Sequence, residues 1–167
     1  MDSKRNDGLI AVGLLLAEAG LFGFGHGMSV SPEVSSGNGN PAILLIFVLI
    51  PLFVIHVRAV IRFLHRLQVR PFGLAILLLL SGSSVLFASI YQIHHYRTYR
   101  ADLIDYLMHR EGMTRDLEYI RSITSAFDIH MNDQTFNSMT FFIFTCATLL
   151  VSSSFLLLHH WWLNVPR

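Results

Sequence analysis

Four long apolar stretches alternate with shorter polar segments along the chain, at residues 9–25, 42–64, 72–94 and 139–161. A helix needs about 20 apolar residues to cross the roughly 30 Å of hydrocarbon in a membrane. Within lipid the backbone must also satisfy its own hydrogen bonds, and a helix does so. We therefore predict an all-α, integral membrane four-helix bundle that forms a single domain over residues 1–167.

The polar segment between the third and fourth stretches, residues 96–138, carries a helical pattern of its own. Leu103 and Leu107 recur at helical spacing, and Glu111-Gly112 favours a break. A second stripe with spacings of three and four follows, at Met113, Leu117, Ile120, Thr124, Phe127 and Met131. Asn132-Asp133 is expected to end this second arm. The pattern predicts a small extracytoplasmic helical hairpin between the third and fourth spans.

Charged residues near the spans predict the orientation, because Lys and Arg accumulate in cytoplasmic loops. Basic residues lie before the first span, at the turn after the second span and at the end of the chain: Lys4, Arg5, Arg58, Arg62, Arg66, Arg70 and Arg167. The segment 96–138 also holds arginines, which counts against an outer location, but acidic residues outnumber them there. An even number of spans places this segment outside. We predict a multi-pass protein of the cell membrane with cytoplasmic N- and C-termini and residues 96–138 extracytoplasmic.

Composition excludes several other classes of protein. Charged residues make up 14% of the chain, against about 25% in a soluble domain. The net charge of +1 gives no electrostatic case for binding nucleic acid. The single cysteine, Cys146, excludes a disulfide framework and a cysteine-based zinc site within one chain. The sequence also lacks the G-x-S-x-G, P-loop and H-E-x-x-H patterns, so we expect no enzymatic activity.

The first span has a second interpretation. Lys4 and Arg5, an apolar run from Leu9 and then Ala17-Glu18-Ala19 resemble a signal peptide with a small-x-small cleavage site. Cleavage after Ala19 would remove residues 1–19 and leave three spans.

Glu18 is an acidic residue in the middle of a predicted span. An ionisable group at that depth costs roughly 2.5 kcal/mol or more, so it normally faces other helices and has a partner. No basic residue is expected at its depth, so its predicted partners are hydroxyl groups of the third and fourth spans: Ser81, Ser83, Ser84, Thr148, Ser152, Ser153 and Ser154. This intramembrane polar site is either a proton or cation site, or a neutral carboxyl that joins helices through hydrogen bonds.

The inner end of the second span carries a basic stripe made of Arg58, Arg62, His65 and Arg66. Apolar residues on the other side of the same helix make this end amphipathic. Such a stripe is suited to anionic lipid headgroups or to a protein partner. The simpler interpretation is an anchor that only sets the orientation.

Small residues recur in the first span. Gly13 and Ala17 are four residues apart, as are Ala19 and Gly23. Such pairs allow two helices to approach closely in a membrane. We expect them to pack inside the bundle, and self-association is the alternative.

The nine histidines raise the question of haem or metal binding. Those near span ends are the weak candidates for metal ligands: His26, His94, His95, His56, His159 and His160. Membrane four-helix cytochromes hold haem b between histidine pairs at equal depth. Counted at about 1.5 Å per residue, the inner histidines His56 and His159 lie at different depths, which argues against haem b. We expect no cofactor and no metal.

The function that these patterns favour is that of a small multi-pass accessory protein. It would act by helix–helix contact with a membrane-protein partner or with itself as a homo-oligomer, within membrane lipid and without nucleic acid. A small transporter or channel subunit with Glu18 in its path is one alternative. A haem- or metal-binding membrane protein is another.

Overall fold

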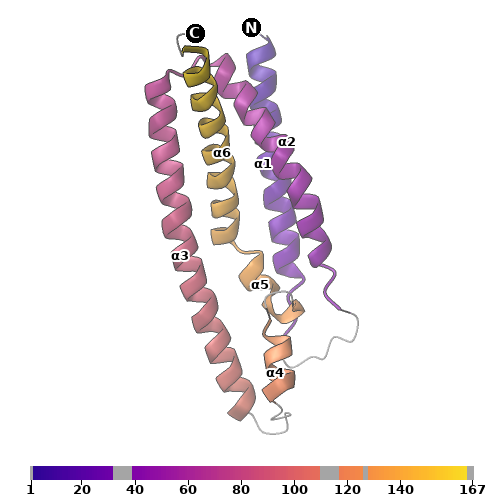
Figure 1. Ribbon diagram of the computed structural model, residues 1–167. Helices are drawn as coiled ribbons and strands as arrows, with labels where there is room; N and C mark the ends of the chain where they lie inside the picture. The colour runs from indigo at the N-terminus through magenta and orange to yellow at the C-terminus, as the bar shows by residue number, and fades with distance from the viewer. Residues whose placement is uncertain (1, 32–38, 110–116, 126–127, 165–167) are drawn as a thin grey trace.

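The computed structural model describes residues 2–31, 39–109, 117–125 and 128–164 (Figure 1). These ranges are helical apart from short turns and contain no strand. Four of the helices in them are long: α1 (Asp2–Gly27), α2 (Ile43–Arg66), α3 (Pro71–His109) and α6 (Ser138–Asn164). Each is long and apolar enough to cross a membrane. The prediction of an all-helical protein with four candidate spans is therefore confirmed.

Two helices extend beyond the apolar stretches that predicted them. α1 begins at Asp2, well before the apolar run. α3 continues for 39 residues to His109, because no proline follows Pro71 to interrupt it. Pro71 itself suits the first position of a helix, where its missing N–H is not needed. The outer turns of α3 therefore project past the start of α6 (Figure 1).

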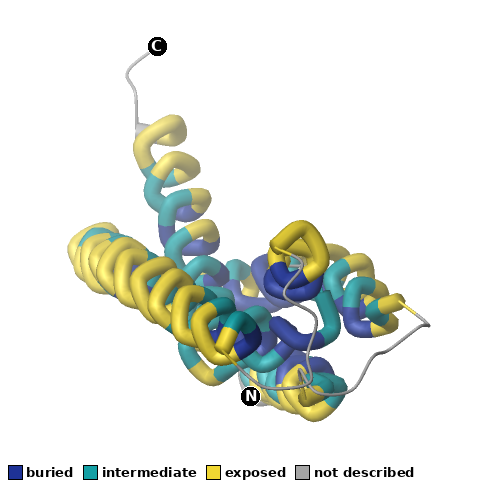
Figure 2. Tube along the Cα trace, turned by 90° about the horizontal axis from the view of Figure 1, so that it is seen from below, coloured by how far each residue is buried: buried dark blue, intermediate teal, exposed yellow. Residues whose placement is uncertain are grey.

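The long helices pack unequally on one another. α1 lies mainly on α2, and α3 lies mainly on α6, which also contacts α1 and α2. The N- and C-terminal ends lie at the same end of the molecule, together with the turn between α2 and α3 (Figure 1). At that end buried Val60, Leu64, Leu74 and Leu156 join α2, α3 and α6. Along its whole length α3 buries few side chains, and much of it is exposed (Figure 2).

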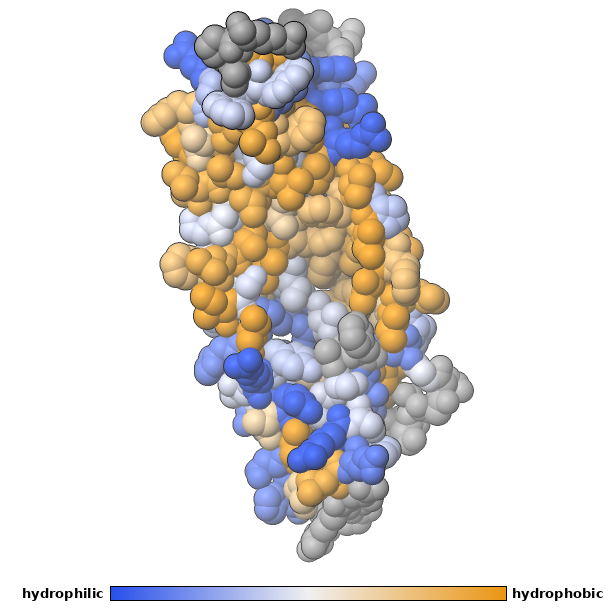
Figure 3. Space-filling model, viewed as in Figure 1, coloured by the Kyte–Doolittle hydropathy of each residue, from blue (hydrophilic) through white to orange (hydrophobic). Residues whose placement is uncertain are grey.

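On the face shown in Figure 3, apolar side chains form a broad belt over the middle of the molecule, and polar residues gather towards both ends. Large apolar residues in the belt are exposed on different helices: Leu44 by 67%, Leu79 by 70% and Phe87 by 70%. A soluble monomer rarely exposes an apolar patch of this extent. The belt is therefore the surface that lipid would cover.

The segment between α3 and α6, called the outer segment from here on because it lies at the end of the molecule away from the termini (Figure 1), packs against the far end of α3. α4 (Leu117–Ile123) and η1 (Ile129–Met131) are followed by α5 (Asn132–Thr135), which leads into α6. Buried side chains of α3, α4 and η1 form one cluster: Leu103, Leu107, Ile120, Ile123 and Met131. Leu103, Leu107, Ile120 and Met131 of the predicted stripes therefore meet in this cluster, whereas Leu117 of the second stripe is exposed and Ile123 was not predicted.

The second stripe does not form one continuous helix, and that prediction is wrong. α4 ends at Ile123, and Asn132 begins α5 instead of ending an arm. The carboxylate of Asp128 accepts the backbone N–H of His130 at 3.0 Å. This local bond starts a new turn and competes with a continuous helix. The predicted break at Glu111-Gly112, together with Met113 and Phe127, lies outside the described residues.

Candidate functional site

Glu18 of α1 and His56 of α2 form a buried pair between the two helices. The His56 Nδ1 atom lies 2.7 Å from the Glu18 Oε2 atom. The side chains are 5% and 0% exposed, respectively. A distance this short is typical of a charge-assisted hydrogen bond. One proton between the two atoms makes the bond, whichever of the two groups carries it.

The pair forms because Glu18 lies on the face of α1 that packs inward. Asp7, Phe22 and Gly25 are buried on the same face, at spacings that match the helical period of 3.6 residues per turn. One turn further along α1 from Glu18, the ring of Phe22 packs against those of Phe136, Phe141 and Phe144, with centroids 5.5–5.9 Å apart. Aromatic rings therefore cover the outer side of the pair.

The prediction that no basic side chain lies at the depth of Glu18 is wrong. Counting residues inward along parallel helix axes placed His56 near the inner face. The two helices in fact stay in step: from the ion pair of Asp7 with Arg66, Glu18 lies 11 residues along α1 and His56 lies 10 residues back along α2, whereas the prediction counted from Pro41 at the other end of α2. His56 is consequently the side chain that meets Glu18.

The serines that the sequence assigned to Glu18 bond elsewhere. Most of them donate to the carbonyl four residues earlier in their own helix, as Ser153 does to Leu149 at 2.7 Å. The same pattern holds for Ser81, Ser83, Thr148, Ser152 and Ser154. Serine in a helix can satisfy itself in this way. The prediction that serine and threonine hydroxyls bind the Glu18 carboxyl is therefore wrong, because its partner is His56.

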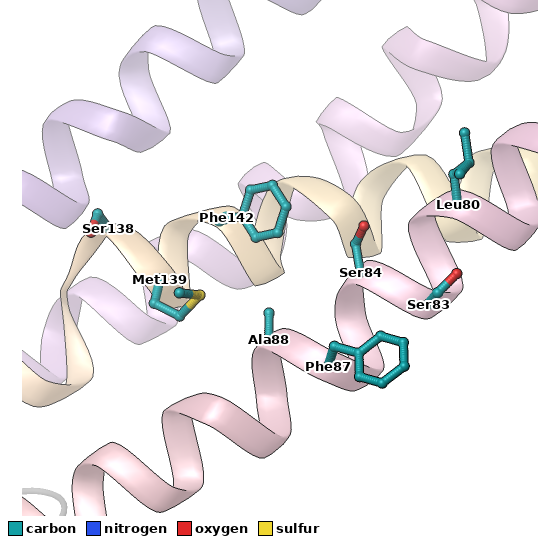
Figure 4. A pocket seen from close by; sticks show the side chains of 8 residues that line it. All are labelled: Leu80, Ser83, Ser84, Phe87, Ala88, Ser138, Met139 and Phe142. Carbon is teal, nitrogen blue, oxygen red and sulfur yellow. The ribbon is translucent and has the colours of Figure 1, made fainter.

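Ser83 and Ser84 lie in a different place, a groove between α3 and α6 (Figure 4). The groove has a volume of about 600 Å³ and is lined by Leu80, Ser83, Ser84, Phe87, Ala88, Ser138, Met139 and Phe142. It opens where α3 diverges from α6. Two of the predicted site residues thus line an apolar groove between two spans.

The predicted basic stripe divides into separate environments. Arg66 is tied to α1, since its Nη1 atom lies 2.6 Å from the Oδ2 atom of buried Asp7. Arg58 and Arg62 line a hollow between α2 and α6. His65 lines another hollow, which also includes His160. The stripe is therefore not one uniform surface.

The candidate histidines are likewise dispersed. The Nδ1 atom of His56 is engaged by Glu18, and that of His95 lies 3.0 Å from the Oε1 atom of Gln134. His26 borders a small hollow beside Phe136. Over the part of the chain that the structure describes, no three His, Cys, Asp or Glu side chains gather as a metal site would require. His94 and His159 are exposed.

A second polar cluster ties the outer segment to the first connection. Asn132 is 1% exposed, and its amide exchanges hydrogen bonds of 2.7 and 3.0 Å with that of Asn40. His130, also buried, lies with Nδ1 2.9 Å from the carbonyl oxygen of Val30. Nearby, burial and the Asp133 carboxylate raise the pKa of the Tyr99 phenol. These contacts join parts of the chain that are far apart in the sequence.

We expect Asn132→Ala to loosen this outer segment. The substitution removes both hydrogen bonds between the amides of Asn132 and Asn40 at a position that is 1% exposed, which costs about 1–2 kcal/mol. The free energy of unfolding in detergent should fall by that amount, and proteolysis of the outer segment should become faster. Asn6→Ala, at an exposed asparagine, is the control, and equal effects of the two substitutions would contradict the assignment.

No family model, curated protein or solved structure matches this chain.

Proposed function

We propose that the protein is a small, non-enzymatic accessory protein of a cell membrane that acts by helix–helix contact with a membrane-protein partner or a second copy. The observation that carries this proposal is a row of glycines on the side of α1 that faces away from the other helices. A Cβ atom built at Gly13, Gly20 or Gly27 meets nothing within 4 Å. These glycines are exposed in the described chain, as is Ala17.

The row of Gly13, Gly20 and Gly27, which we call the glycine face, is not explained by packing within the chain. The expectation that Gly13 and Gly23 bring helices of this chain together is wrong, because both would admit a Cβ without contact. Glycine costs about 0.5–1 kcal/mol in a helix relative to alanine. In membranes, small residues on a helix allow the backbone of another helix to approach closely. The glycine face therefore favours contact with a helix from outside this chain.

The buried pair supports the same proposal by setting the rotation of α1. Gly20 and Gly27 lie on the side of α1 opposite Glu18, given 3.6 residues per turn. The bond from Glu18 to His56 and the ion pair of Asp7 with Arg66 hold the inward side against α2. The glycine face is consequently kept towards lipid, where a partner would meet it.

We propose the predicted topology as the setting for this contact. A four-helix bundle with an extracytoplasmic hairpin at 96–138 would place both termini in the cytoplasm. The support is that both ends of the described chain and the arginine-bearing end of α2 lie at one end of the molecule (Figure 1).

Association should depend on the glycine face. We expect Gly20→Ile to abolish co-purification of a second copy or a stoichiometric partner from mild detergent, because its side chain blocks close helix approach. Gly20→Ala should weaken association less. The matched control is Leu16→Ile, on the same side of α1 at a residue that is already large and 67% exposed.

All three variants should fold like the original protein, because the glycine face borders open space. A monomeric original protein without a partner would overturn the proposal, and so would full association of Gly20→Ile.

A transporter or channel subunit with Glu18 in its path remains the second candidate. One observation favours it: the Glu18 Oε1 atom is buried and has no hydrogen-bond partner among the described residues. An acid with an unused oxygen could receive a cation or a proton. A liposome flux assay with Glu18→Gln decides this, since flux that is absent or unchanged removes the candidate.

A further inference from the structure

A hollow between α2 and α6 combines cationic and apolar side chains. It has a volume of about 620 Å³ and is lined by Ile55, Arg58, Ile61, Arg62 and Phe155. Among the described residues no acidic side chain lines it. It lies towards the end of the molecule that carries both termini, since α2 and α6 both finish there (Figure 1).

The lining of the hollow extends deeper into the apolar belt than its two arginines do. Both helices run towards the end with the termini, so Ile55 lies deeper in the apolar belt than Arg58 and Arg62. Ile55 and Phe155 are 49% and 55% exposed. On α6, His159 follows Phe155 by one turn and is exposed as well. Ile61 lies between the two arginines along α2, and the hydrogen bond from Ser152 to the Val57 carbonyl places Phe155 near their level. The hollow therefore combines basic and apolar side chains at the level of the arginines and is apolar further in, at Ile55.

Arg58 and Arg62 differ from Arg66, the next arginine on α2. Arg66 is tied to the carboxylate of Asp7, whereas Arg58 and Arg62 are exposed on successive turns beside the hollow. Guanidinium groups bind phosphate oxygens through paired N–H donors. Basic pockets between membrane helices suit anionic headgroups. Charge and depth in this hollow therefore match a molecule with an anionic phosphate and an apolar chain.

We propose that this hollow binds an anionic glycerophospholipid of the membrane leaflet at the end that carries the termini. Arg58 and Arg62 bind its phosphate, and one acyl chain lies along Ile55 and Phe155. The proposal does not depend on the glycine face, which lies on α1.

Native mass spectrometry of the purified full chain tests the proposal, with phosphatidylglycerol and phosphatidylcholine added to the detergent. The original protein should retain phosphatidylglycerol in preference to phosphatidylcholine. We expect Arg58→Gln/Arg62→Gln to bind phosphatidylglycerol about 30-fold more weakly, the combined effect of two cationic side chains at an anionic membrane surface. The matched control is Arg97→Gln/Arg121→Gln, which removes two exposed arginines from the outer part of the protein and should change little.

Two further measurements keep the test decisive. Arg58→Lys/Arg62→Lys preserves the charges that direct insertion but not the paired donors, so it should insert normally and bind at an intermediate level. Glycerol phosphate, which has no acyl chain, should fail to displace the lipid. Equal retention of the two lipids, equal losses in the Gln variant and its control, or displacement by glycerol phosphate would each overturn the proposal.

Discussion

Separating Glu18 from His56 should be the most damaging single change in the membrane-spanning part. We expect Glu18→Leu and His56→Leu each to lower the free energy of unfolding by about 3–5 kcal/mol, because removal of one partner leaves the other buried and uncompensated. The double variant should lose less than the sum of the two, because apolar residues of similar volume can replace a buried pair at small cost. Unfolding by SDS in mixed micelles measures all three variants.

Ser153→Ala provides the matched control for this series. Ser153 is buried and bonds within its own helix, so its loss should cost about 1 kcal/mol. If the Glu18 and His56 variants cost no more than the control, or if their effects were simply additive, the pair would not hold α1 to α2.

Gly25→Ala should be the next most damaging change, because Gly25 allows the closest approach to Phe136. A Cβ atom at Gly25 would lie 2.5 Å from the Phe136 Cγ atom, and Phe136 is itself only 3% exposed. Since the obstructing atom is at the base of the ring, the ring must move as a whole. Such overpacking costs about 1–3 kcal/mol, which the same unfolding measurement would detect.

The neighbouring glycines make this prediction specific. Gly23→Ala and Gly27→Ala place a Cβ in open space and should be neutral or slightly stabilising. In a Phe136→Ala background, Gly25→Ala should cost nothing further. A uniform response of all three glycines would show that helix propensity, and not the contact with Phe136, governs these positions.

The hydrophobic pattern was enough to predict the helices, because lipid imposes both their length and their hydrogen bonding. The helical spacing of Leu103, Leu107 and Ile120 likewise marked them as positions on apolar stripes, and in the structure they share a cluster. The turns within that segment were not predictable, since they depend on local hydrogen bonds such as the one that the His130 backbone N–H donates to the Asp128 carboxylate.

Counting depth from Pro41 missed the partner of Glu18, because the level at which α1 packs on α2 is set by tertiary contacts such as the ion pair of Asp7 with Arg66. A signal was nevertheless present in the sequence. His56 is an ionisable residue on the inner part of a span, and such residues normally face a partner. The outward direction of Gly13 and Gly20 could not be predicted either, because it follows from which side of α1 the pair with His56 selects.

The glycine face and the buried pair thus lie on opposite sides of α1 and have different roles. The inward side is held to α2 through Glu18, and the outward side is left small enough to receive another helix.

The most direct test of this account places a photo-cross-linking amino acid at Gly20 in membranes of cells that make the protein. We predict one cross-linked product of defined mass, which disappears when Gly13→Ile is added. The same amino acid at Leu79, on the exposed side of α3, should give no such product. Absence of a product from position 20, or the same products from both positions, would contradict the claim that α1 binds another helix through its glycines.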